Sequence, residues 1–139
     1  DGSIQYLNKR LPTVFDLFAR RFLPIWMQDI PAIKRRMEYF IMKDCGYESI
    51  QNVPFVSGCF MLFRKKILDQ IGFFDEKFFL YLEDTDITVR VNQITKAVYY
   101  PDAVITHTWS RESHKSIRFT FITIKSAIYF FKKWGWRWI

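Results

Sequence analysis

Residues 53–63 read Val-Pro-Phe-Val-Ser-Gly-Cys-Phe-Met-Leu-Phe, an apolar run that is broken by one glycine, Gly58. A short continuous apolar run is typical of a buried strand in an α/β protein. A glycine inside a strand either forms a simple bulge or marks a place where a ligand or another backbone comes close. The run therefore predicts a buried strand, and both interpretations of Gly58 stay open.

Helical patterns follow this run toward the C-terminus. The spacing of the apolar residues predicts a helix of about two turns over 64–71, with Gly72 as its C-terminal cap. An aromatic loop over 73–82 then leads to a second helix, which is expected to begin at Asp84. This order of strand, helix, loop and helix favours an α/β fold.

The flanking segments continue the pattern. Further short strands are expected over 4–7, 97–100 and 104–106. A helix is expected from Pro12 to Phe22, because Pro24 would end it. Residues 25–52 carry apolar positions at threes and fours, which predict either a helix or an irregular excursion.

The C-terminal residues 115–139 predict a long amphipathic helix that is basic and aromatic. Arg118, Lys125 and Lys132 are seven residues apart, so these three cations fall on one face, and the opposite faces carry Phe, Ile and Tyr. Such a helix suits an anionic membrane surface. It equally suits packing against the rest of the fold, and the pattern does not decide between the two.

Composition and charge set further bounds. The chain has 139 residues, the length of one domain, and half of them are hydrophobic, which excludes a mainly disordered protein. The net charge of +7 is uneven, because residues 1–43 and 105–139 are basic while residues 44–104 carry 6 basic and 9 acidic side chains. No nucleic-acid partner is expected, since no reader motif is present and the basic residues are split between the two ends. An acidic centre is more useful to an active site.

The two cysteines, Cys45 and Cys59, form no CxxC pair, which argues against a disulfide framework or a structural zinc site. A reduced, cytoplasmic setting is therefore expected. The chain starts with Asp1 and shows neither a signal peptide nor a run of about 18 apolar residues. Because the first residue is not methionine, we expect these 139 residues to be a fragment or a processed form of a longer protein.

An ordered set of short motifs carries a family resemblance. The set comprises Gly58–Arg64, Gly72–Glu76, Phe78–Asp86, Tyr99–Pro101 and His107, preceded by Asp1–Gln5 and Arg10–Thr13. It resembles the C-terminal half of family 2 glycosyltransferases, in particular rhamnosyltransferase-like bacterial members. The resemblance implies an α/β fold with a partial GT-A-type mixed sheet, flanking helices and the long C-terminal helix.

In that family the N-terminal half holds the sugar nucleotide and the C-terminal half holds the acceptor. Residues 1–139 would then be the acceptor-binding part, and the family's Asp-x-Asp metal motif would lie upstream of it. Asp84-Thr85-Asp86 has the same spelling but matches the family's later Glu-Asp motif. We therefore expect the chain alone to be inactive and to bind neither nucleotide nor metal. The intact enzyme is expected to use a divalent metal, Mg or Mn.

The resemblance also implies roles for individual residues. Asp84 would be the general base of an inverting transfer, with Glu83 beside it in the acceptor site. Gly58, Tyr81 and Asp86 would contact the acceptor, and His107 would contact a metal or the leaving pyrophosphate. An aspartate at a helix N-terminus is held ionised by backbone amides, so it is ready to take a proton from a hydroxyl group.

Each assignment has a structural alternative. Asp84 could be an ordinary N-cap, with Glu83 and Asp86 favouring the first helical turn. His107 could bond a backbone carbonyl, and Tyr81 could belong to the core. At the level of the whole chain, the alternative is a non-catalytic module that binds glycans or membrane.

The implied partners are a nucleotide-sugar donor, with rhamnose as one candidate sugar, and a glycan or lipid-linked acceptor in cell-surface polysaccharide synthesis. The expected location is the cytoplasm, at the inner face of the plasma membrane if the helix over 115–139 binds lipid. A half-domain with uncovered sheet edges would also favour a homodimer.

Overall fold

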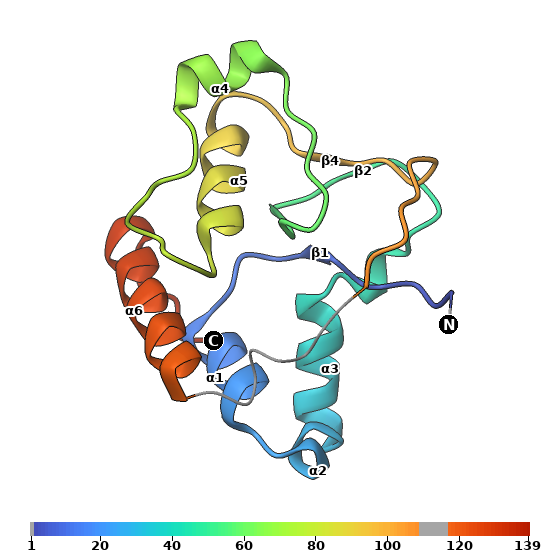
Figure 1. The fold of residues 1–139 in the computed structure, drawn as a ribbon. Coiled ribbons are helices and arrows are strands. Elements are labelled where there is room, and N and C mark those ends of the chain that lie inside the picture. The colour runs from blue at the N-terminus through green and yellow to red at the C-terminus, as the bar shows by residue number, and fades with distance from the viewer. Residues whose placement is uncertain (1, 109–116) are drawn as a thin grey trace.

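The protein is described here from a computed structural model, which covers residues 2–108 and 117–139. The chain is a mixed α/β structure in which helices predominate (Figure 1). Its elements are β1 (Asn8–Lys9), α1 (Val14–Phe22), α2 (Ile25–Gln28), α3 (Pro31–Phe40), the 3-10 helix η1 (Lys43–Cys45), β2 (Gln51–Asn52), β3 (Phe55–Val56), α4 (Lys65–Ile71), α5 (Glu83–Ile94), β4 (Val98–Tyr99) and α6 (Ile117–Trp134).

The strands form two separate antiparallel pairs in the described part of the chain. β1 pairs with β3, with Asn8 opposite Val56 and Lys9 opposite Phe55. β2 pairs with β4, with Gln51 opposite Tyr99. The expected single mixed sheet is thus not seen among these residues, because each strand here has only one neighbour.

Of the buried strand predicted over 53–63, only Phe55–Val56 forms a strand, and the rest of the prediction is wrong. Val53 and Phe55 are buried as expected, but the chain turns at 58–60 and Leu62 is 92% exposed. A strand exists only where a neighbouring backbone pairs with it, and β1 offers such a partner to Phe55 and Val56 alone. The strands expected over 4–7 and 104–106 are also absent, and the first strand forms at Asn8–Lys9 instead.

The helices were predicted more accurately than the strands. The helix expected up to Phe22 is α1, and the segment over 25–52 contains α2, α3 and η1. The two-turn helix is α4, and Gly72 caps it with a φ of 80°, a conformation that glycine adopts easily. The next helix, α5, begins one residue earlier than expected, at Glu83.

The N-terminus of α1 is fixed by its own cap and by the C-terminal tail. Thr13 and Asp16 form a capping box, in which each side chain accepts the other's backbone N–H. The N–H groups of Val14 and Phe15 donate to the carbonyls of Arg137 and Trp138, at 2.8 and 3.2 Å. The tail therefore satisfies amides that the first turn of a helix leaves free.

The long C-terminal helix is present as α6, while Lys115 and Ser116 lie outside the described residues. Phe130 and Phe131 of α6 are buried against Phe78 and Leu82, and this cluster is the centre of the core. The packing interpretation of this helix is therefore confirmed for its last turns. No helix among the described residues is long and apolar enough to cross a membrane.

Candidate active site

The site is built around the turn that precedes α5. Tyr81 and Leu82 both have a φ of 68°, a left-handed conformation that non-glycine residues adopt at a cost of about 1–3 kcal/mol each. The turn is held because Leu82 is buried in the core and the Ser126 hydroxyl donates to the carbonyl of Leu80 at 2.8 Å. Such strain is found mainly at functional sites, and here it directly precedes Glu83 and Asp84.

The Asp84 carboxylate is oriented by backbone amides and stays partly exposed. Its Oδ2 accepts a hydrogen bond from the N–H of Gly58 at 2.9 Å, and its Oδ1 accepts one from the N–H of Thr85 at 2.7 Å. Oδ1 also accepts a hydrogen bond from the Thr85 hydroxyl at 3.3 Å, so Oδ2 is the oxygen that keeps a lone pair for a further partner. The N-cap position of α5 belongs to Leu82, so the interpretation of Asp84 as an ordinary N-cap is wrong.

Gly58 is required by the close approach of Asp84. A Cβ atom at position 58 would lie 3.3 Å from the Cβ of Asp84, which is tighter than ordinary van der Waals contact. The neighbour at this glycine is thus the side chain of Asp84, whereas the sequence predicted a ligand or another backbone. Contact of Gly58 with an acceptor sugar stays a prediction.

Glu83 lies beside Asp84 in a drier environment. Its Oε2 atom is buried and has no hydrogen-bond partner among the described residues. Burial raises the pKa of Glu83, and the adjacent negative charge of Asp84 raises it further. Glu83 therefore keeps its proton to higher pH than an ordinary glutamate.

Two cations that the sequence did not single out complete the electrostatics of the site. Lys9 on β1 is buried, with its Nζ 4.8 Å from the centre of the Phe55 ring. Burial lowers the pKa of Lys9 to about 8, the charge of Arg20 lowers it further, and the charge of Asp84 opposes the shift. The negative charge of Asp84 also acts on Arg20. Lys9 and Arg20 are thus two cations whose charges interact with that of Asp84.

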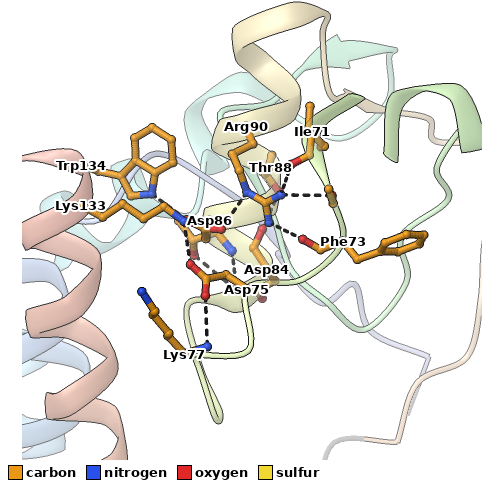
Figure 2. Close-up of polar contacts among 12 residues, drawn as sticks. Ile71, Phe73, Asp75, Lys77, Asp84, Asp86, Thr88, Arg90, Lys133 and Trp134 are labelled. Carbon is orange, nitrogen blue, oxygen red and sulfur yellow. Dashed lines mark hydrogen bonds and ion pairs between the residues drawn. The ribbon is translucent and has the colours of Figure 1, made fainter. Parts of the chain in front are cut away.

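Asp86, which was expected to contact the acceptor, lies in a buried ion-pair network instead (Figure 2). Its carboxylate has no exposed surface and binds Lys133 Nζ at 2.7 Å, Trp134 Nε1 at 2.8 Å and Arg90 Nε at 2.9 Å. Arg90 also donates to the carbonyls of Ile71, Gly72 and Phe73. This network joins α4, α5 and α6 and fixes the helix that carries Asp84. Acceptor binding by Asp86 stays a prediction that this packing does not favour.

His107 is paired with the N-terminal segment, and its metal or pyrophosphate contact stays a prediction. Its Nδ1 lies 3.0 Å from Oε1 of Gln5, and Nε2 of Gln5 donates to the carbonyl of His107 at 2.9 Å. No group of three His, Cys, Asp or Glu side chains that could hold a metal occurs within residues 2–108 and 117–139. These residues do not make a metal site by themselves, so we derive no step through a metal.

The predicted site residues are thus only partly gathered. Gly58, Glu83 and Asp84 lie together, and Tyr81 is half-buried in the turn before them. Lys9 was missed because its place beside the site depends on the pairing of β1 with β3, and no local pattern reveals that pairing. β1 itself consists of two polar residues, Asn8 and Lys9, so the sequence held no signal that would have identified Lys9.

Comparisons with known proteins bear on this site. No protein-family model matches the chain, and no solved structure matches it. The chain is 38% identical over 109 residues to the N-acetylglucosaminyl-diphospho-decaprenol L-rhamnosyltransferase of Mycobacterium tuberculosis strain CDC 1551 / Oshkosh, and equally to the protein of that name from strain ATCC 25618 / H37Rv. The match covers 77% of this chain and 34% of each relative, so the chain spans about a third of the length of the curated relatives it matches. This similarity supports a relationship to glycosyltransferases.

Proposed function

We propose that this chain is the acceptor-side part of an inverting glycosyltransferase, with Asp84 as the general base. The observation that carries the proposal is the Asp84 carboxylate, which is partly exposed, oriented by the N–H groups of Gly58 and Thr85, and placed at the N-terminus of α5. An oriented carboxylate with a free lone pair on Oδ2 is suited to accept a proton.

The proposed step transfers a sugar from a nucleotide donor. The acceptor hydroxyl oxygen attacks the anomeric carbon of the donor sugar, and a new C–O bond forms as the bond to the nucleotide diphosphate breaks. The hydroxyl proton passes to the Asp84 carboxylate, and the electron pair of the broken bond leaves with the diphosphate. Attack from the face opposite the leaving group inverts the anomeric configuration.

The neighbouring charges suit this step. The raised pKa of Glu83 favours the neutral form of its own carboxyl group, beside Asp84. Lys9 and Arg20 provide positive charge that is suited to the diphosphate leaving with the nucleotide. The donor site itself is proposed to lie in a second half-domain, because the chain matches only about a third of its relatives' length.

The relatives suggest the substrates. Their printed name describes L-rhamnose transfer to an N-acetylglucosaminyl-diphospho-decaprenol. We propose that the donor here is a nucleotide-activated L-rhamnose and that the acceptor is a glycan carried on a lipid diphosphate, in cell-surface polysaccharide synthesis.

The proposal is tested with a protein in which this chain is joined to a donor-binding half. The enzyme is incubated with nucleotide-activated L-rhamnose and N-acetylglucosaminyl-diphospho-prenol, and the product linkage is read by NMR. We expect a new glycosidic bond whose anomeric configuration is opposite to that of the donor. A product with the donor's configuration would contradict the role of Asp84 as a base, because retention needs a different mechanism.

Contact with a membrane is the second candidate property, and the exposed C-terminal tail favours it. Trp136 and Trp138 stack on each other, and Trp138 and Ile139 are among the most exposed apolar residues of the chain. Interfacial tryptophans of this kind suit a bilayer surface. Deletion of the whole helix would also remove Phe130 and Phe131 from the core, so the test uses point variants. We expect Trp138→Ser with Ile139→Ser to weaken sedimentation with anionic vesicles; unchanged sedimentation would contradict this.

A further inference from the structure

A groove lies between the aromatic loop and the first turns of α6, apart from the Asp84 carboxylate. Its volume is about 720 Å³, within the range of about 300–1,000 Å³ that is usual for small-molecule sites. The lining residues are Lys77, Phe79, Ile117, Arg118, Phe121, Ile122, Lys125 and Ser126. Arg118 and Lys125 belong to the cationic face of the C-terminal helix, and Ser126 donates to the carbonyl of Leu80.

The lining combines two chemistries. Phe79 and Phe121 are 76% and 69% exposed, an unusual degree of exposure for large apolar side chains in one groove. Lys77, Arg118 and Lys125 supply three positive charges, and none of the three forms an ion pair with a carboxylate among the residues that the structure describes. A ligand that suits this groove is therefore both hydrocarbon and multiply anionic.

One residue that lines the groove is hydrogen-bonded to the segment just before the proposed base, Asp84. Ser126, which lines it, donates to the carbonyl of Leu80. Leu80 precedes Asp84 by four residues, so the two Cα atoms are at most about 14 Å apart. A molecule whose anionic group lies in the groove could thus place an attached sugar near Asp84.

We infer that this groove binds the diphosphate and the first isoprene units of a lipid-linked acceptor. The inference rests on the proposed function, because it concerns the acceptor of that reaction. The cations of Lys77, Arg118 and Lys125 pair with the diphosphate, while Phe79 and Phe121 cover the hydrocarbon chain. A diphosphate carries more charge than a phospholipid headgroup with one phosphate, so it is the better match for the three cations of the groove.

The test measures binding of farnesyl diphosphate to the 139-residue chain by calorimetry. Arg118→Gln with Lys125→Gln removes two groove cations, and Phe121→Ser removes an exposed ring. The matched controls are Lys65→Gln with Lys66→Gln and Leu62→Ser, which change exposed residues outside the groove. We expect the cation variant to bind at least about tenfold more weakly, as loss of charged hydrogen bonds predicts. Phe121→Ser should weaken binding as well, and both controls should bind like the unchanged chain.

Two further probes separate the components of the ligand. Inorganic pyrophosphate and farnesol should each bind more weakly than farnesyl diphosphate. The inference would be overturned by equal binding of farnesyl diphosphate to the groove variants and the unchanged chain. It would also be overturned if phosphatidylglycerol vesicles without prenyl diphosphate bound as tightly and responded to the same substitutions. No donor or transfer step enters this experiment, so its failure is distinct from a failure of Asp84 as the base.

Discussion

The backbone N–H of Gly58 donates a hydrogen bond to Oδ2 of Asp84 at 2.9 Å, and this contact joins two segments that are 26 residues apart. It fixes the orientation of the carboxylate that we propose as the general base. It also explains the glycine in the apolar run, because a Cβ at this position would press against Asp84. The proposed chemistry therefore depends on a residue without a side chain.

Replacement of Gly58 by alanine should disturb Asp84 more than it disturbs the fold. The added methyl group would meet the Cβ of Asp84 at 3.3 Å, so the carboxylate must shift by a few tenths of an ångström. We expect the free energy of unfolding to fall by about 1 kcal/mol. We also expect kcat to fall by more than the small decrease in the folded fraction of the protein would cause. Urea denaturation and transfer assays measure the two effects. The control is Ser57→Ala, and equal kcat values for the two variants would refute this role of Gly58.

The ion-pair network of Asp86 predicts different effects for substitutions of two neighbouring lysines. Lys133 lies 2.7 Å from the fully buried carboxylate of Asp86, whereas Lys132 on the same helix forms no ion pair with a described residue. Lys133→Met should lower the free energy of unfolding by about 2 kcal/mol, because it removes a partner of a buried charge. Lys132→Met should change it by less than about 0.5 kcal/mol. Similar denaturation midpoints for the two variants would show that Asp86 does not need Lys133.

Asp75 should contribute to stability in a way that is lost in acid. The hydrogen bond from Lys133 lowers the pKa of Asp75 to about 2, and bonds from the Lys77 N–H and Tyr129 add to this effect. Because the folded pKa lies below the unfolded value of 3.8, the contribution is complete above about pH 4 and declines as the pH falls toward 2. Asp75→Asn should therefore lower stability at pH 7, and the difference from the unchanged chain should shrink at low pH. A difference that stays constant from pH 7 to pH 2 would exclude this linkage.

Lys9 should destabilise the fold while it supports activity. Burial lowers the pKa of Lys9 to about 8, below its ordinary value of 10.5. The cost of burying its charge is therefore present below about pH 8 and disappears as the pH rises toward 10.5. Lys9→Met should raise the melting temperature at pH 7, with a smaller gain at pH 10, and should lower the transfer rate. The exposed Lys96→Met is the control. A variant that is less stable at pH 7, or fully active, would contradict this prediction.

The helices could be predicted from the sequence because their signals are local. Apolar spacing placed α4 and α5, and Gly72 marked the end of α4. The strand expected over 53–63 forms only at Phe55–Val56, since a strand also needs a neighbour that the run itself does not specify. The same limit concealed Lys9, whose position depends on pairing with Phe55 across 46 residues.

The sequence motif at the start of α5 identifies three carboxylates but does not distinguish their roles. The family resemblance drew attention to Glu83, Asp84 and Asp86 together, yet their environments differ. Asp84 is partly exposed, and Glu83 is half-buried with one oxygen that has no partner within 2–108 and 117–139. Asp86 is enclosed by Lys133, Arg90 and Trp134. Only the packing of α6 against α5 separates a candidate base from a structural ion pair, and that packing is not visible in the motif.

The most direct test of the central claim is the transfer rate of Asp84→Asn in a protein that joins this chain to a donor-binding half. Asparagine keeps the shape of the side chain and an oxygen that can accept from the Gly58 N–H, but it cannot take up the proton. We predict that kcat falls by roughly 100- to 10,000-fold, as loss of a general base predicts, while the dissociation constant of the donor stays within about twofold and Asp69→Asn remains fully active. A kcat for Asp84→Asn within about threefold of the unchanged enzyme would contradict the assignment of Asp84 as the base.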